Sequence, residues 1–275
     1  MTRGAMKKYN LKEKYVLITG ASSGIGKELA RCFAEAGSHC VLHSIPRERD
    51  ALIEWGRELQ NRYSVRTWCL IEDFADDEGP GNLVRNIMEH VPRVDVLVNN
   101  AGTMVYGNVH EASLKSQVDL VKVNIGGYLA LMRLLIPDMV KRGDGRVLNI
   151  SSVSAFQPCP HHAVYGASKS FIQSLSEAVS QELRGTGVKV TAFCPSYTKT
   201  PLLQVKDFPE KVWWYKISGL SDPAEVARQG MEALVKGKTV AVPGLMSKFV
   251  HLVLNRFLPR SIVAVISNFV LRGAK

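Results

Sequence analysis

The sequence lacks the features that would place it in several large classes of protein. Its five cysteines form no C-x-x-C pair and follow no secretory signal, so we expect reduced thiols and a cytoplasmic location. The adjacent His161 and His162 have no spaced partner cluster, so the sequence predicts no metal site. No uninterrupted apolar run of about 18 residues occurs, so we expect no transmembrane helix.

The chain also lacks an internal repeat and a linker rich in glycine, proline or serine. Its 275 residues suit one large core, and 46% hydrophobic with 22% charged residues is ordinary for a globular enzyme. The formal charge of +10 favours anionic partners, or simply a solvated basic surface. Nucleic acid is the least favoured partner, because the basic residues form no cluster with interleaved aromatic residues.

Short apolar runs alternate with helical patterns along most of the chain. The predicted strands are 15–18, 40–43, 65–71, 94–98, 146–150, 188–193 and 239–242, and the predicted helices are 24–36, 47–61, 82–91, 114–141, 165–183 and 223–235. Such alternation is typical of a parallel sheet with helices on both faces. We therefore predict an α/β fold with a single doubly wound domain of about seven parallel strands over residues 14–244, after a loose polar tail at 1–13.

A glycine-rich turn joins the first predicted strand to the first helix. It reads Thr19-Gly20-Ala21-Ser22-Ser23-Gly24-Ile25-Gly26, with the spacing G-x-x-x-G-x-G. Glycines allow a tight turn and a close approach of ligand, and the start of a helix offers free N–H groups to a pyrophosphate. Such a turn can also simply pack a helix against a strand. Its place at the first strand–helix junction favours a dinucleotide site in a Rossmann-type fold.

Four further motifs follow this turn in order. They are Asn99-Asn100-Ala101-Gly102 after the fourth strand, Asn124 in the long helix, Asn149-Ile150-Ser151-Ser152 at the end of the fifth strand, and Tyr165-Gly166-Ala167-Ser168-Lys169 at the start of a helix. From about Lys14 to Thr200 the set resembles the motifs of the short-chain dehydrogenase/reductase family. The resemblance implies an NAD(P)-dependent oxidoreductase that interconverts a ketone and a secondary alcohol.

Tyr165 and Lys169 are four residues apart, so a helix places both side chains on one face. A free tyrosine titrates near ~10, and we expect the nearby ammonium to lower the pKa of Tyr165 by favouring the phenolate. Tyr165 would then exchange a proton with the substrate oxygen. The resemblance implies that Ser152, rather than Ser151, binds that oxygen, and that Asn124 holds a water that passes protons toward Lys169.

The end of the second strand bears on the choice of cofactor. An acid there would bind the adenosine ribose and repel a 2′-phosphate, but Ser44 and Ile45 follow this strand without an Asp or Glu. Arg47 and Arg49 come next, and arginine binds phosphate through charge-assisted hydrogen bonds. We therefore predict NADP(H) rather than NAD(H), although Ile45 replaces the family's usual arginine and Ser23 stands at another position that is often basic.

Further cofactor contacts are implied by the resemblance. Asp73 matches the position that touches the adenine ring, and the segment Pro195-Ser196-Tyr197-Thr198-Lys199-Thr200 resembles the one that meets the nicotinamide amide. Ser196 and Thr198 replace the usual glycine and valine of that segment. The predicted cofactor-binding residues are Gly20, Ser22, Ser23, Gly24, Ile25, Gly26, Ser44, Arg47, Asp73, Asn100, Ala101, Gly102, Tyr165, Lys169, Pro195, Thr198 and Thr200.

Residues 200–220 resemble the family's mobile substrate lid. Leu202, Leu203, Phe208, Trp213 and Trp214 make this segment apolar. This composition indicates an apolar carbonyl or alcohol substrate, or alternatively a lid that packs on the body or on a partner subunit.

Residues 245–275 resemble the C-terminal extension of a bacterial subgroup of the family. Pro259 should divide the segment into two helices, with the apolar residues Phe249, Leu252, Val253 and Phe257 facing inward. Such helices suit a cap over the pocket, a subunit contact in a homodimer or homotetramer, or peripheral membrane contact. We favour the cap.

The main functional alternative is a non-catalytic dinucleotide-binding sensor or scaffold. Such a protein would not need Asn124, Ser152, Tyr165 and Lys169 together, so we favour an enzyme.

Overall fold

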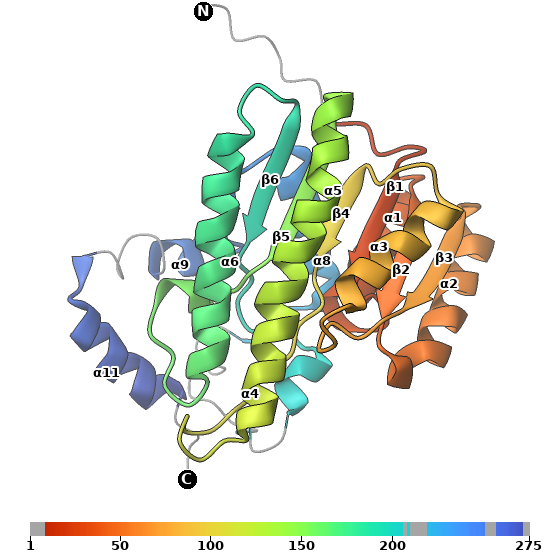
Figure 1. The fold of residues 1–275 in the computed structure, drawn as a ribbon. Coiled ribbons are helices and arrows are strands. Elements are labelled where there is room, and N and C mark those ends of the chain that lie inside the picture. Colours follow the sequence, from red (N-terminus) through yellow and green to blue (C-terminus); the bar gives the residue numbers. More distant parts are fainter. Residues whose placement is uncertain (1–8, 206–207, 210–218, 251–256, 272–275) are drawn as a thin grey trace, which may run out of the picture.

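The computed structural model describes residues 9–205, 208–209, 219–250 and 257–271. Its centre is one parallel sheet in the order β3-β2-β1-β4-β5-β6-β7 (Figure 1). The strands are β1 (Tyr15–Thr19), β2 (His39–Ser44), β3 (Thr67–Ile71), β4 (Val96–Asn99), β5 (Gly145–Ile150), β6 (Val188–Phe193) and β7 (Val240–Ala241). The predicted doubly wound α/β fold is confirmed, because every strand pair is parallel.

Helices cover both faces of the sheet. The longer ones are α1 (Gly24–Glu35), α2 (Arg49–Tyr63), α3 (Gly79–His90), α4 (Leu114–Val121), α5 (Tyr128–Arg142), α6 (Ala163–Glu182), α8 (Pro223–Val235) and α11 (Arg260–Leu271). The shorter ones are η1 (Pro46–Glu48), η2 (Lys122–Gly127), η3 (Val153–Phe156), η4 (Pro201–Gln204) and α9 (Leu245–Lys248). Helices α1, α2 and α8 pack on one face, and α3, α5 and α6 pack on the other.

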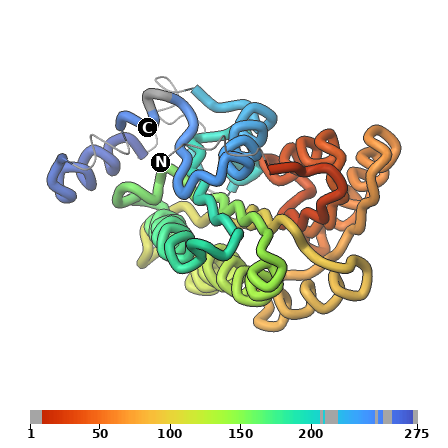
Figure 2. Tube along the Cα trace, turned by 90° about the horizontal axis from the view of Figure 1, so that it is seen from above, coloured from red at the N-terminus to blue at the C-terminus, as the bar shows by residue number. Residues whose placement is uncertain are grey.

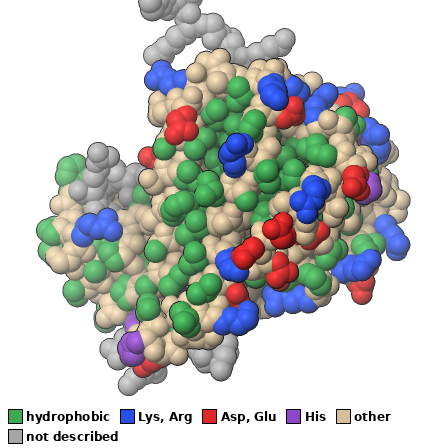
Figure 3. Space-filling model, viewed as in Figure 1, with side chains coloured by type: hydrophobic (Ala, Val, Ile, Leu, Met, Phe, Trp, Pro, Cys, Tyr) green, Lys and Arg blue, Asp and Glu red, His purple; other side chains and the backbone are tan. Residues whose placement is uncertain are grey.

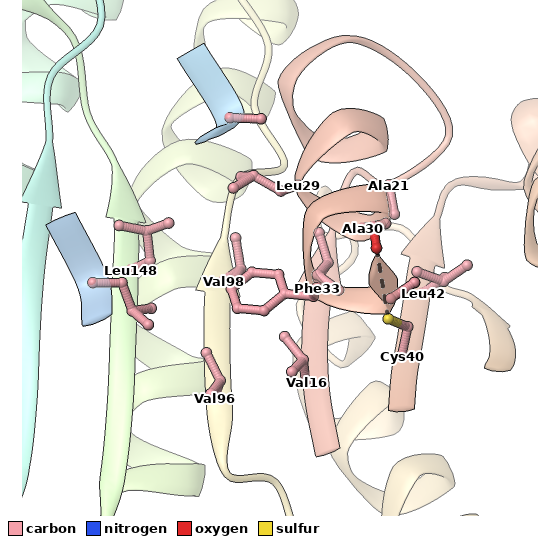
Figure 4. Packing of buried hydrophobic residues seen from close by; sticks show 14 of the residues in the cluster. Val16, Ala21, Leu29, Ala30, Phe33, Cys40, Leu42, Val96, Val98 and Leu148 are labelled. Atoms are coloured by element: carbon pink, nitrogen blue, oxygen red, sulfur yellow. Dashed lines mark hydrogen bonds between the residues drawn. The ribbon is translucent and has the colours of Figure 1, made fainter. Parts of the chain in front are cut away.

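The strands form because nearly every side chain along them is apolar and buried on one face or the other. In β1, Val16 and Ile18 pack toward α1, whereas Leu17 points to the opposite face and joins the core under α3 and α5. Figure 4 shows the first of these cores, in which Phe33 of α1 lies among Val16 and Val98.

The strand order reverses between β1 and β4, which places the carboxyl ends of these two strands side by side. In a doubly wound sheet, a ligand crevice opens at this point of reversal. The loops that follow β1, β4, β5 and β6 all meet at this edge of the sheet, and they carry the motifs that the sequence singles out.

The predicted helix 114–141 forms as one stretch, Leu114–Arg142, interrupted by the π-helical turn η2. By length and composition alone it could cross a membrane, and it is the one described helix that passes this test; 44% of its most apolar window is buried. Leu131, Leu135 and Met139 pack in the core beneath α3, so the fold accounts for the apolar composition of α5.

Near both ends of the chain, the structure differs from the sequence prediction. The predicted loose tail at 1–13 is wrong for its described part, because Leu11 is buried in the core and Tyr9 packs under Arg146, whose guanidinium lies 4.0 Å from the ring centre. In the C-terminal segment, α11 begins directly after Pro259 as predicted. Phe249 and Phe257 are exposed rather than inward, and among the described residues of this segment the buried ones belong to α11. Leu252 and Val253 lie outside the described residues.

The C-terminal segment stands apart from the N-terminal half of the sheet. Figure 2 shows the blue chain of α11 at one end of the molecule and the red and orange elements at the other. Val263, Ser267 and Leu271 form the buried stripe by which α11 contacts the body.

Candidate active site

Thr19, at the end of β1, ties the glycine-rich turn to the loop after β4. Its hydroxyl donates a hydrogen bond to the Val98 carbonyl (3.3 Å) and accepts hydrogen bonds from the N–H groups of Asn100 (2.9 Å) and Ala101 (3.0 Å). The Asn100 amide donates in turn to the carbonyls of Thr19 (2.9 Å) and Gly20 (3.1 Å). The two motifs therefore form one rigid wall.

This wall depends on glycine at two positions. Gly20 has φ +64°, and a Cβ there would lie 2.9 Å from the Cα of Ala101. A Cβ on Gly26 would collide with the Gly20 carbonyl oxygen, so Gly26 lets α1 begin directly against the turn.

The start of α1 suits an anionic ligand. No side chain caps its first turn, and no acidic residue lies within that turn. Its free N–H groups and the positive end of its dipole therefore face the cavity at Ser23, Gly24 and Ile25, as pyrophosphate binding requires. These residues fit a nicotinamide dinucleotide.

A cavity of about 480 Å³ runs along the carboxyl edge of the sheet. Of the predicted cofactor-binding residues, all except Gly26 line it: Gly20, Ser22, Ser23, Gly24, Ile25, Ser44, Arg47, Asp73, Asn100, Ala101, Gly102, Tyr165, Lys169, Pro195, Thr198 and Thr200. Ser152 lines it as well. Gly26 does not, because its position is used in the packing of the turn.

Ser152, Tyr165 and Lys169 meet at one end of this cavity. The Lys169 ammonium donates to the Ile150 carbonyl (3.0 Å) and lies 5.6 Å from the centre of the Tyr165 ring. The Ser152 hydroxyl accepts the N–H of Ser154 (3.1 Å) and lies near enough to the Tyr165 hydroxyl to act on its pKa. The Ser151 hydroxyl instead donates to the Lys169 carbonyl (2.8 Å), so it holds α6 against β5. This difference supports Ser152, rather than Ser151, as the serine that meets a substrate.

Burial dominates the acid–base properties of this pair. It raises the pKa of Tyr165 to about 12, although the nearby Ser152 hydroxyl acts in the opposite direction. Burial likewise lowers the pKa of Lys169 to about 8. The expectation that Lys169 gives Tyr165 a lowered pKa is therefore wrong for this structure, because desolvation of the phenolate outweighs the other influences. Tyr165 is a protonated phenol at neutral pH, which is the form that can donate a proton.

Asn124 lies behind the cavity wall, within η2. Its side-chain oxygen accepts the N–H of Thr103 (2.9 Å), and its amide donates to the Thr103 carbonyl (3.0 Å) and to the Ser168 hydroxyl (3.2 Å). A Cβ on Gly102 would lie 3.3 Å from the Asn124 oxygen and 3.7 Å from the Lys169 nitrogen, so all three groups are neighbours. Asn124 thus joins the loop after β4 to α6 beside Lys169.

Glu48 and His162 are among the polar residues of the cavity wall that the sequence analysis did not predict. Glu48 accepts hydrogen bonds from Ser22 and, at 2.8 Å, from Ser44. It lies between Arg47 and Arg49, which the sequence analysis considered, but its contact with Ser22 and Ser44 is visible only in the folded chain. His162, three residues before Tyr165, is buried, and burial lowers its pKa to about 4, so it is a neutral imidazole.

The end of the cavity beside Tyr165 is apolar. Met104 and four residues after β6 line it: Leu202, Leu203, Val205 and Phe208. The predicted lid residues Trp213 and Trp214 lie outside the described residues. Within the described part of the chain, no group of three or more His, Cys, Asp or Glu residues is placed to hold a metal ion.

Comparison with known proteins gives a consistent family. The sequence model of the short chain dehydrogenases matches residues 14–210. An uncharacterized oxidoreductase of Staphylococcus epidermidis is 31% identical over 201 residues, which cover 73% of this chain and 85% of that protein.

Two solved structures share the fold. L-sorbose reductase from Gluconobacter frateurii, in complex with NADPH and L-sorbose, is 25% identical, with a TM-score of 0.75 over 86% of this chain and 96% of that chain. The 3-ketoacyl-(acyl-carrier-protein) reductase from Brucella melitensis, in complex with NADH, is 26% identical, with a TM-score of 0.75 over 84% and 96%.

The chain belongs to the short-chain dehydrogenase family. It is an NAD(P)-dependent oxidoreductase that acts on CH–OH and C=O groups, on the Rossmann-type fold predicted from its sequence.

Proposed function

We propose that the protein interconverts a ketone and a secondary alcohol on an apolar substrate, with Tyr165 as the general acid and base. The observation that carries this proposal is the meeting of Ser152, Tyr165 and Lys169 at the junction between the dinucleotide cradle and the apolar end of one cavity.

A nicotinamide dinucleotide held by the glycine-rich turn would supply the hydride when a carbonyl carbon is reduced. The Tyr165 phenol donates its proton to the carbonyl oxygen, which the Ser152 hydroxyl holds by a hydrogen bond. The Lys169 ammonium stabilises the phenolate that remains and, with Asn124 beside it, returns a proton. In the reverse direction, the phenolate accepts the alcohol proton.

Leu202, Leu203, Val205 and Phe208 support an apolar substrate, because they line the cavity and pack against the cluster that contains Tyr165. The Brucella melitensis relative acts on a 3-ketoacyl chain, which agrees with such a wall, whereas the Gluconobacter frateurii relative binds a sugar. We propose an acyl-chain, steroid or other lipid-like ketone.

For the cofactor, we propose NADP(H) on the evidence of Arg47, which lines the cavity beyond Ser44; Arg49 does not line it. Glu48 opposes this preference, because its carboxylate occupies the same part of the wall. The sequence argument for NADP(H), that no acid lies near the end of β2, is therefore wrong, because the folded chain places Glu48 there.

We propose that the C-terminal segment caps the substrate end of the cavity. The Tyr106 hydroxyl donates to the Leu271 carbonyl (2.9 Å), and His161 and Asn268 share a hydrogen bond of 2.9 Å. Tyr106 also stacks near His162, which lines the cavity, so α11 contacts the loop that leads into the catalytic helix. This continuity favours the cap over peripheral membrane contact.

We propose a cytoplasmic homodimer or homotetramer. Hydrophobic side chains gather on the face formed by α5 and α6 in Figure 3, and Leu129, Leu134 and Phe171 are among the exposed ones. An apolar helix face of this kind suits contact with a second copy.

A panel of ketones and alcohols tests the function when each is assayed with NADH, NADPH and their oxidised forms by nicotinamide absorbance. We expect turnover of at least one apolar pair in the natural chain and a loss of it in Tyr165→Phe. Turnover that is equal in both proteins would overturn the proposed role of Tyr165.

A further inference from the structure

The Glu48 carboxylate joins three separate segments of the chain. Ser22 comes from the glycine-rich turn, Ser44 ends β2, and Glu48 belongs to η1. The two serine hydroxyls lie 2.9 Å apart, both serines are buried, and both hydroxyls hydrogen-bond to the same carboxylate oxygen of Glu48. The carboxylate is therefore held in place on the cavity wall.

This position is not explained by the helix that follows. Glu48 is the residue that precedes α2, where a side chain often caps the free N–H groups, but its carboxylate makes no such hydrogen bond. It turns away from α2 and toward the cradle. Its side chain stays 35% exposed and lines the cavity, and the two serines leave its second carboxylate oxygen without a hydrogen bond from them.

We propose that Glu48 binds the hydroxyl groups of the adenosine ribose and weakens the binding of a 2′-phosphate. This inference rests on the proposed function, because it requires a dinucleotide in the cavity. In doubly wound folds the ribose lies between the glycine-rich turn and the end of the second strand, and an acid there accepts its hydroxyl protons. In this protein, Ser22 and Ser44 hold the Glu48 carboxylate of η1 at that position by hydrogen bonds.

The same carboxylate acts against phosphate in two ways. It repels the phosphate charge directly, and it draws the Arg47 guanidinium, whose Nε lies 3.8 Å from Glu48 Oε1, into an ion pair. The Arg47 side chain is 81% exposed and is not held by a second partner in the described contacts, whereas Glu48 is fixed by two hydroxyls. The balance between Arg47 and Glu48 thus sets the cofactor preference.

Binding titrations test this without turnover. Dissociation constants for NADH and NADPH are measured by fluorescence for the natural chain, Glu48→Gln and Arg47→Ala, at low and at moderate salt. Glu48→Gln keeps the size and the hydrogen bonding of the side chain but removes its charge. We expect it to shift the NADPH-to-NADH affinity ratio toward NADPH by about tenfold, and by less at moderate salt. Arg47→Ala is the matched control, and it should shift the ratio the opposite way.

The outcomes separate two failures. If the natural chain binds either dinucleotide but Glu48→Gln leaves the ratio within twofold, the role of Glu48 is refuted and the proposed function stands. If the natural chain binds neither dinucleotide, the proposed function fails, and the inference with it. Adenosine 5′-monophosphate and adenosine 2′,5′-bisphosphate, followed by thermal shift, should show the same change in ratio; an equal loss of both would mark a folding defect and refute selectivity.

Discussion

Replacing Lys169 with methionine should make the folded chain more stable at neutral pH. The Lys169 side chain is 3% exposed, and burial lowers its pKa from 10.5 to about 8. At pH 7 the folded chain therefore carries an ammonium in a place that disfavours it. The difference between the two pKa values corresponds to roughly 3 kcal/mol of lost stability.

Part of this gain is offset. The Lys169 ammonium donates a hydrogen bond to the Ile150 carbonyl, and its loss should cost about 1 kcal/mol. Methionine has a side chain of similar length and fills the same space. We expect Lys169→Met to raise the free energy of unfolding by about 2 kcal/mol at pH 7.

The pH dependence is the sharper signature. The folded chain releases the Lys169 proton first, so between pH 8 and 10.5 the unfolded chain binds more protons and the stability of the natural protein rises with pH. The advantage of Lys169→Met should therefore be largest below pH 8 and nearly gone by pH 10. Urea unfolding at pH 7 and pH 10, at one protein concentration, measures this. Lys189→Met, which replaces an exposed lysine on β6, is the control. A variant that is less stable at pH 7, or a difference that does not change with pH, would refute the reasoning.

Three further predictions address the reaction, the tail and the assembly. Tyr165→Phe should lower turnover by about 10²- to 10⁴-fold while dinucleotide affinity by fluorescence titration stays within twofold; an unchanged kcat would exclude Tyr165. Removal of residues 245–275 should lower activity and raise binding of an apolar dye; unchanged stability and kinetics would refute the cap, and sedimentation with anionic vesicles would then test membrane contact. Leu129→Glu with Leu134→Glu should shift the sedimentation coefficient toward a monomer, and an unaltered coefficient would exclude this face.

The sheet was predictable because its information is local. A run such as Val16-Leu17-Ile18 is apolar at every position, and that pattern alone specifies a strand covered on both faces. The motifs were predictable for the same reason, since the turn at Gly20 and the Tyr165–Lys169 spacing are each contained in a few consecutive residues. The expected grouping of these motifs on one cavity followed from the parallel strand order.

The missing parts depend on contacts between distant segments. Glu48 is held at the site because the hydroxyls of Ser22 and Ser44, from two other segments, donate hydrogen bonds to its carboxylate. The direction of the Tyr165 pKa shift depends on burial, which is a property of the packed molecule and not of the Tyr–Lys spacing. Leu11 is buried in the core, although the residues next to it in the sequence are polar and give no sign of this burial.

The buried lysine also bears on whether the chain is an enzyme or a dinucleotide-binding sensor. A sensor needs the cradle at Gly20 and the ribose contacts, but it gains nothing from an ammonium buried beside a phenol at the other end of the cavity. An enzyme does gain, because the ammonium stabilises the phenolate that forms when Tyr165 gives up its proton. Retaining Lys169 at a cost in stability is therefore expected only if the proton transfer takes place. We therefore expect Lys169→Met to be more stable, to bind the dinucleotide and to turn over no substrate. This combination would show that Lys169 serves the reaction and neither folding nor cofactor binding.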